Sequence, residues 1–336
     1  MLAVFYAASG SAAPVTPRRS LLALSKANHT LAVVDPISLK VIARLPVGPD
    51  PHEVIASSDG ATAYVSNTGS GRMHELDILD LVAQKALPSF DTGPLLGPHG
   101  LVFVAGTLWF TAEGAKSVAR YDPAAAKVDW LLGTGQNRTH MIDVSQDAKQ
   151  VTTTNVDSGT VSILENVLLP PTVTPLGTLP PGAKPRMEWI ETVVPVGKGS
   201  EGFDISPDGR ELWTAAAQDG TLSVIDLAAK KVVATIDAKI LGANRLKFTP
   251  DGRRALISSL RIGELFIYDV ASRKEVKRLN IGHGGAGLLV DSDGTRAFVA
   301  CSPDDYVAVI DLKKLEVAGH VDVGGKPDGL AWAVRP

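Results

Sequence analysis

The sequence predicts an all-β fold, a seven-bladed β-propeller with four antiparallel strands in each blade. Three observations predict it. A phrase of short apolar strands recurs along the chain, the recurrence has a period of about 42 residues, and an Asp-Gly pair stands at the same place in four copies. This period is the length of a propeller blade rather than of a helical repeat. The 336 residues therefore form one domain, although an average chain of this length would hold two.

The copies align on the residue that begins the first strand of each blade. The spacings between successive copies are 47, 41, 61, 43, 42 and 42 residues, and the aligned residues are His52, His99, His140, Glu201, Asn244, Ala286 and Asp328. Asp-Gly pairs at 59–60, 208–209, 251–252 and 293–294 lie where the first hairpin of a blade must turn. Glycine supplies the positive φ that such a turn needs without steric strain.

The seventh copy is divided between the two ends of the chain. Residues 328–334 form a first strand alone, and the chain start supplies further strands at 21–24, 30–35 and 40–47. We expect the C-terminal strand to join the N-terminal strands in one sheet, because this closure removes two open sheet edges. The propeller then occupies residues 20–336.

The spacing of 61 residues between His140 and Glu201 is longer than the others because it contains an insertion at 166–189, which holds six prolines. Proline is incompatible with a central β-strand, so we expect irregular structure there. The insertion falls between the third and fourth strands of its blade. We therefore expect it on the face opposite the aligned histidines, unless it wraps around the blade edge. A plain surface excursion and a loop that docks a protein partner both remain open.

Residues 1–19 precede the repeats and begin with the apolar stretch MLAVFYAASGSAA, with no basic segment before it. This stretch is either an N-terminal arm or the remnant of an export signal. The second interpretation predicts a periplasmic or secreted protein. The first leaves a cytoplasmic location open.

The composition excludes several classes of function. A net charge of -3 argues against a nucleic-acid binder. A single cysteine rules out a disulfide scaffold, a c-type haem attachment and a zinc ribbon. The chain has no run of 18 apolar residues, so no membrane-spanning helix is predicted. Glycines 282, 284 and 287 match the NAD-binding spacing, but a strand follows them instead of a helix, so no NAD is expected.

The motifs PHGLVF at 98–103, SPDGRELW at 206–213, YVSN at 64–67 and VIDL at 224–227 resemble the YVTN-type seven-bladed propeller repeat. The resemblance covers nearly the whole chain. It implies a propeller similar to surface-layer and periplasmic binding proteins, lactonases, metal-dependent lyases and the propeller domains of redox enzymes. The tryptophans are too scattered to suggest the per-blade tryptophans of PQQ propellers. Because one fold serves many functions, the site residues must decide between these classes.

The first strand of each blade lines the central channel, so the aligned residues ring its mouth. Three of the seven histidines fall in this ring, at His52, His99 and His140, and Glu201 follows on the next blade. Three imidazoles and a carboxylate can hold a divalent transition metal with a position open for water or substrate. A metal-free polar pocket is the second interpretation. A repeat feature that only caps the turn between blades is the third.

Other residues are predicted around this mouth. Arg245 and Arg138 could hold an anionic group of a substrate through paired hydrogen bonds. Asn244, Asp328, Asn155 and His283 are further candidates for substrate contact. The loops between second and third strands add a pocket rim, consisting of Asn67, Glu113, Asn155, Asp157 and His29.

These residues, together with the resemblance to the YVTN-type repeat, imply three functions. The first is a metal-assisted hydrolase or lyase, lactonase-like, in which the three histidines bind the ion and Arg245 orients the substrate. Glu201 either completes the metal site or acts as general base. The second is a non-catalytic, extracytoplasmic binding or scaffold propeller of YVTN type. The third, an accessory to a redox system, is a minor option, because the chain has no haem motif.

Overall fold

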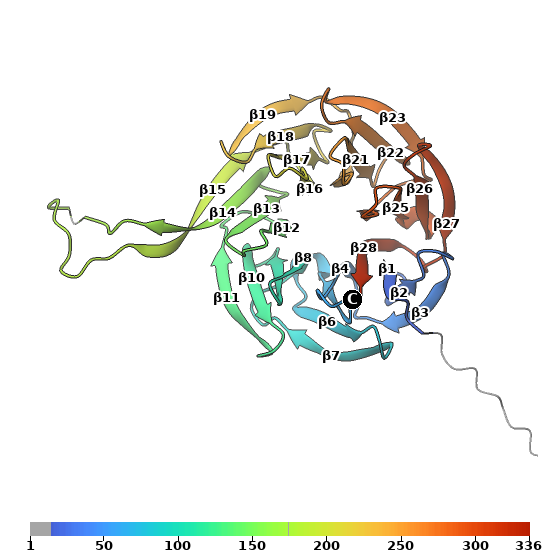
Figure 1. Ribbon diagram of the computed structural model, residues 1–336, viewed down its shortest axis with the longest axis horizontal. Coiled ribbons are helices and arrows are strands. Elements are labelled where there is room, and N and C mark those ends of the chain that lie inside the picture. Colours follow the sequence, from blue (N-terminus) through green and yellow to red (C-terminus); the bar gives the residue numbers. More distant parts are fainter. Residues whose placement is uncertain (1–14, 174) are drawn as a thin grey trace, which may run out of the picture.

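The computed structural model of this protein describes residues 15–173 and 175–336 and confirms the seven-bladed propeller. Over these residues, 28 strands form seven sheets of four antiparallel strands each, arranged around a central axis (Figure 1). Most of the N-terminal arm predicted at 1–19 lies outside the described residues. In the described part of the chain, no helix has both the length and the apolar character needed to span a membrane.

Each blade runs from an inner strand at the axis to an outer strand at the rim (Figure 1). The strands, grouped by blade, are β4 (Pro51–Ala56), β5 (Thr62–Asn67), β6 (Glu75–Asp80) and β7 (Lys85–Asp91); β8 (Pro98–Val104), β9 (Thr107–Ala112), β10 (Ser117–Asp122) and β11 (Lys127–Gly133); β12 (Thr139–Val144), β13 (Gln150–Asn155), β14 (Thr160–Leu169) and β15 (Arg186–Pro195); β16 (Ser200–Ile205), β17 (Glu211–Ala216), β18 (Leu222–Asp226) and β19 (Lys231–Ile236); β20 (Ala243–Phe248), β21 (Arg254–Ser259), β22 (Glu264–Asp269) and β23 (Lys274–Asn280); β24 (Leu288–Val290), β25 (Arg296–Cys301), β26 (Tyr306–Asp311) and β27 (Glu316–Val321).

The seventh blade closes the ring as predicted. Its order is β28 (Pro327–Val334), β1 (Arg19–Ser25), β2 (Thr30–Val34) and β3 (Val41–Pro46), so the last strand of the chain pairs with the first. The pairing is antiparallel and places Leu22 opposite Ala331. The hairpin turns predicted at the Asp-Gly pairs are also present, with φ values of 65° at Gly60 and 73° at Gly209.

Among the described residues, the hydrophobic core is divided into seven clusters, and each cluster lies between two neighbouring blades. One cluster joins Leu22 and Val33 of the closing blade to Val54 and Leu79 of the next. The alternating apolar residues of each sheet therefore pack against the facing sheet rather than against a common centre. A blade has no complete core of its own, so closure of the ring is needed to bury every sheet face.

A β-bulge in the first strand presents the mouth residues. In the blade of β8, the register shifts between Pro98 and Leu101, and His99 lies within that shift. The Gly100 N–H, which the bulge removes from the ladder, donates to the Thr111 hydroxyl. The same hydroxyl donates to the His140 carbonyl of the next blade at 2.5 Å. The Thr111 hydroxyl thus pairs with the N–H that the bulge frees and also fixes the backbone position of His140.

The proline-rich insertion forms a two-stranded ribbon that leaves the disc at its rim (Figure 1). Pairing with β13 ends at Glu165, whereas β14 and β15 stay paired with each other out to Leu169 and Arg186. All six prolines fall within 170–185, between the two ribbon strands. The insertion is therefore partly regular, because a ribbon with two strands has no central strand for proline to disrupt.

Candidate functional site

The structure brings the three ring histidines together in neighbouring blades. His52, His99 and His140 are each the second residue of an inner strand, namely β4, β8 and β12. The ring centroids of His52 and His99 lie 5.0 Å apart, and those of His99 and His140 lie 3.9 Å apart. His99 and His140 are buried, with exposed fractions of 3% and 2%.

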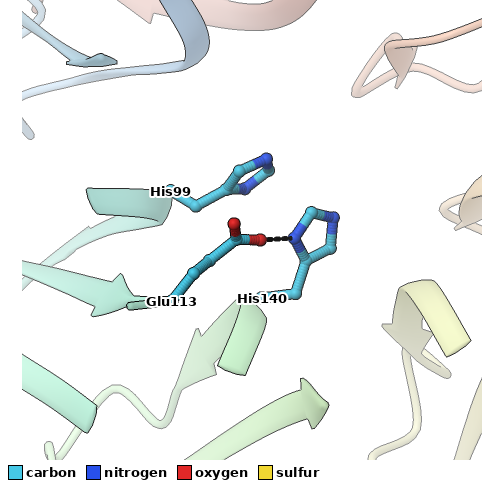
Figure 2. A group of neighbouring side chains, drawn as sticks. All are labelled: His99, Glu113 and His140. Carbon is cyan, nitrogen blue, oxygen red and sulfur yellow. Dashed lines mark hydrogen bonds and ion pairs between the residues drawn. The ribbon is translucent and has the colours of Figure 1, made fainter. Parts of the chain in front are cut away.

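A compact group of possible metal ligands forms from His99, His140 and Glu113, with one ligand atom of each within 4.8 Å of the others. Figure 2 shows the three side chains converging, with the Glu113 carboxylate bonded to His140. That bond joins Glu113 Oε1 to His140 Nδ1 at 2.5 Å. Glu113 directly follows β9, in the loop where a rim residue was predicted. His52 is outside this group.

The electrostatics of the group favour a positive charge on His140. Burial acts to lower the pKa of His140, but the hydrogen bond to Glu113 and the negative charges of Glu113 and Glu201 outweigh it, so this pKa is raised. His140 Nε2 lies 3.3 Å from Glu201 Oε2 as an ion pair, outside hydrogen-bond geometry. Burial also acts to raise the pKa of Glu201, yet His140, Arg138 and Arg245 hold it at about 2. Glu201 is therefore ionised.

His99 differs from its neighbour in charge. Burial lowers the pKa of His99 well below its usual value, and the nearby positive charge of His140 lowers it further. The ring is therefore neutral. Its Nδ1 is buried and has no hydrogen-bond partner among the described residues. A buried polar atom of this kind is uncommon in proteins and indicates an interaction still to be made.

His52 makes polar contacts with a lysine, Lys26, and not with His99 or His140. Lys26, in the loop between β1 and β2, places Nζ 2.7 Å from His52 Nε2. The same ammonium lies 3.0 Å from Asp50 Oδ1 and 3.4 Å from Asp328 Oδ2. Asp328 is the ring residue of β28, and burial raises the pKa of its carboxyl. This group adjoins the pair of buried histidines.

Arg245 lies across the channel in an ion pair. Its Nη2 contacts Glu53 Oε1, and both side chains are buried. Glu53 belongs to β4 and Arg245 to β20, on opposite sides of the disc, so the pair bridges the central channel (Figure 1). Nη1 of Arg245 also donates to Asn244 Oδ1 at 3.2 Å. Its guanidinium is therefore largely satisfied within the protein.

Arg138 and Asn244 are placed around Glu201. Arg138 lies 3.4 Å from Glu113 and 3.6 Å from Glu201, with 41% of its side chain exposed. Asn244 Nδ2 donates to Glu201 Oε2 at 3.0 Å. Arg138 is thus a partly open cation of the mouth, whereas Asn244 donates a hydrogen bond to the Glu201 carboxylate.

Two predicted substrate contacts lie apart from this group. Asn155 is buried and donates to the hydroxyls of Thr160 and Ser162, inside its own blade. His283 is exposed and pairs with Asp304 at 2.5 Å. Neither lines the cavities at the mouth.

Two adjoining cavities open at the mouth and share His52, His99 and Arg138. The wider one, of 650 Å³, extends along Glu113, Asp157 and Lys116. The narrower one, of 280 Å³, contains Lys26, His140, Glu201, Asn244, Arg245 and Asp328 among its lining residues. Together they offer a polar recess for a small molecule, with charged groups of both signs on its walls.

Three charged residues that contact predicted residues of this mouth were not selected from the sequence: Lys26, Asp50 and Glu53. A signal existed for two of them. Lys26 occupies the same inter-strand loop that gave Asn67 and Glu113 in other blades, and Glu53 directly follows a ring residue. What the sequence could not show was the pairing of Glu53 with Arg245, because the two are 192 residues apart and meet only when the ring closes.

No model of a known protein family matches this chain, and no curated protein matches it. Many solved structures do. A functionally unknown protein from Desulfotomaculum acetoxidans has a TM-score of 0.73 at 10% identity, over 94% of this chain and 99% of that one. A candidate 6-phosphogluconolactonase from Bacteroides fragilis has a TM-score of 0.70 at 13% identity, over 94% and 98%.

The dihydro-heme d1 dehydrogenase NirN in complex with DHE has a TM-score of 0.62 at 17% identity, over 94% of this chain and 65% of that one. At such low identities, these likenesses show a shared propeller fold and nothing of a shared activity. The resemblance to the YVTN-type repeat stays a resemblance of sequence.

Proposed function

We propose that the mouth is a metal-dependent site for a small anionic molecule, at which an ester or lactone bond is hydrolysed or cleaved. His99, Glu113 and His140 would hold a divalent transition metal. The observation that carries the proposal is His99, which is neutral and buried, with Nδ1 free of any partner among the described residues. A bound cation would satisfy that nitrogen.

The donor set fits such an ion. Two imidazoles and one carboxylate suit Zn²⁺ and other first-row divalent ions, and three protein ligands leave positions for water or substrate. In known metal sites the second ring nitrogen of a histidine ligand usually donates to a carboxylate. Glu201, 3.3 Å from His140 Nε2, is placed to be that acceptor. When bound, the ion would polarise a carbonyl or phosphoryl oxygen as a Lewis acid.

In this proposal, the other residues of the mouth bind and orient the substrate or hold a neighbouring side chain in place. Arg138 faces the shared part of both cavities and would hold an anionic group of the substrate. Asn244 keeps Glu201 in place through its amide. Arg245 is held by Glu53, so its charge would act on the site from the channel side without rotating into it. The lactone-type substrate rests on the YVTN-type resemblance and on the name of the Bacteroides protein, which supports it only through the fold.

The deciding experiment measures metal in protein purified without a histidine tag, by mass spectrometry. We expect close to one divalent ion per chain in the parent protein, and its loss in His99→Ala. Glu201→Gln should keep the ion with roughly 10- to 100-fold weaker affinity, because it replaces the charged acceptor beside His140 with a neutral one. The matched control is His74→Ala, an exposed histidine paired with Asp91 outside both cavities. Folded parent protein that takes up no added Zn²⁺, Mn²⁺ or Co²⁺ would reject the proposal.

A non-catalytic binding propeller is the second candidate. It is favoured by the internal pairing of the mouth, where Arg245, Lys26 and Arg138 each already face a carboxylate of the protein. Such a pocket holds its own charge balance and needs no ion to fold. Absence of metal uptake together with unchanged thermal stability of His99→Ala would support it.

A further inference from the structure

A lysine ammonium lies beside the group of His99, Glu113 and His140, which we call the His99 group. Nitrogen and oxygen atoms of the kind that bind metals surround this ammonium. Lys26 Nζ contacts His52 Nε2 at 2.7 Å, Asp50 Oδ1 at 3.0 Å and Asp328 Oδ2 at 3.4 Å. Only 24% of the Lys26 side chain is exposed. These groups come from three separate segments, since Lys26 lies after β1, Asp50 and His52 lie at the start of β4, and Asp328 belongs to β28. They meet only because the ring closes.

We propose that Asp50, His52 and Asp328 form a second cation site, which the ammonium of Lys26 occupies as a tethered substitute for a divalent metal ion. One imidazole and two carboxylates are ligands that Zn²⁺, Mn²⁺, Fe²⁺ and Co²⁺ accept. Lysine carries a compact point charge on a flexible stem, so it can fill such a position from a neighbouring loop. Removal of that charge turns the three groups into a metal site.

The geometry requires a modest adjustment. Ammonium contacts here span 2.7–3.4 Å, whereas metal bonds to nitrogen and oxygen are about 2.0–2.2 Å. Each ligand atom therefore has to approach the centre by about 1 Å, which rotation of the Asp and His side chains can supply. The His52 ring adjoins the His99 ring, with centroids 5.0 Å apart, so the two cation sites lie side by side at the mouth.

Occupation by Lys26 also explains why His52 lies outside the His99 group. The Lys26 ammonium lies 2.7 Å from His52 Nε2 and 3.4 Å from His52 Nδ1, so a positive charge is already in contact with this imidazole. The positive charge also repels a metal ion from that ring. Lys26 therefore keeps the mouth to one exchangeable ion. This inference goes beyond the proposed function, because it concerns different ligands and holds whether or not His99 binds a metal.

The test compares the Zn²⁺ stoichiometry of four proteins by equilibrium dialysis and mass spectrometry. Lys26→Met removes the charge at similar side-chain length, and we expect it to bind one Zn²⁺ per chain more than the parent. Lys26→Arg keeps a cation and should bind the same number as the parent. The double variant Lys26→Met with His52→Ala should return to the parent number, because it lacks the imidazole ligand.

The result that overturns the inference is a folded Lys26→Met protein with the parent stoichiometry. Lys26→Gln gives the same comparison with a polar side chain if Lys26→Met proves insoluble, and circular dichroism verifies folding of each variant. His99→Ala in the Lys26→Met background separates the two proposals. If the added ion survives there, the Lys26 site stands even where the His99 site binds nothing. If the added ion is lost with His99 but retained on removal of His52, the Lys26 inference is wrong.

Discussion

At the scale of single residues, the mouth separates two adjacent histidines by their charge. His140 contacts two carboxylates and has a raised pKa, whereas His99 is held neutral by burial and by the positive charges around it. The two rings lie 3.9 Å apart, so a second proton there would be strongly opposed. The pair of buried histidines thus carries one positive charge, on His140. A bound metal ion would place its positive charge at the same position.

This charge pattern predicts how metal affinity depends on pH. A histidine must lose its proton before it binds a metal ion, and His140 keeps its proton to a higher pH than an ordinary histidine. The Zn²⁺ affinity should therefore rise about tenfold per pH unit between pH 6 and the raised pKa of His140, and level off above it. His99 adds no further slope, because its pKa is already low.

Titration of Zn²⁺ against a competing chelator at several pH values measures this profile. Glu201→Gln removes one carboxylate that raises the His140 pKa, so its profile should level off at a lower pH than that of the parent. His74→Ala should leave the profile unchanged. An affinity that does not vary between pH 6 and pH 8 would contradict the assignment of His140 as a ligand.

At the scale of elements, a hydroxyl near the end of a second strand joins neighbouring blades. Ser66 donates to the His99 carbonyl, Thr111 to that of His140, and Thr154 to that of Glu201. Ser258 makes the equivalent bond to Ala286. In each case, the N–H freed by the bulge in the same blade donates to the hydroxyl. These contacts set the backbone position of three of the four consecutive ring residues proposed for the site.

Thr111→Val tests this arrangement, because valine keeps the shape and removes the hydroxyl. The change leaves the Gly100 N–H and the His140 carbonyl without this partner inside a buried strand pair. We expect a loss of about 2 kcal/mol in the free energy of unfolding, measured by urea denaturation, together with weaker Zn²⁺ binding. The control Thr235→Val, on the exposed outer strand β19, should change stability by less than about 0.5 kcal/mol. Equal effects of the two substitutions would reject a specific role for Thr111.

At the scale of the whole molecule, stability depends on closure of the ring. Every hydrophobic cluster of the described residues is shared between two blades, and one of the two clusters of the closing blade includes Ala331 and Ala333 of β28. The closing strand also carries Asp328 of the mouth. Loss of β28 exposes the edge of β1 and the apolar residues that face it, and it opens the ring at both neighbouring interfaces.

Deletion of residues 327–336 should therefore abolish cooperative thermal unfolding and cause aggregation, whereas deletion of Pro336 alone should leave the unfolding temperature nearly unchanged. Circular dichroism during heating, with size-exclusion chromatography, measures both outcomes. A truncated protein that unfolds cooperatively at the temperature of the parent would show that six complete blades suffice.

The fold and the position of each blade can be predicted from the sequence alone, because a repeat of fixed length and alternating apolar residues are local properties. The sequence also places His52, His99 and His140 at one mouth, since equivalent positions of equivalent repeats meet around an axis. Even the boundary of the insertion agrees with the end of pairing between β13 and β14 at Glu165. Its ribbon form was missed, because two paired strands can extend beyond a sheet without the support of a third.

Which charged groups face each other depends instead on how the blades pack in three dimensions. Lys26 and Asp328 are about as far apart in the chain as any two residues of the mouth, and they meet through the pairing of β1 with β28. The grouping of His99 and His140 with Glu113, and of His52 with Lys26, depends on side-chain directions across blade interfaces. Such contacts follow from distances of a few ångströms in three dimensions, which the spacing of repeats along the chain does not record.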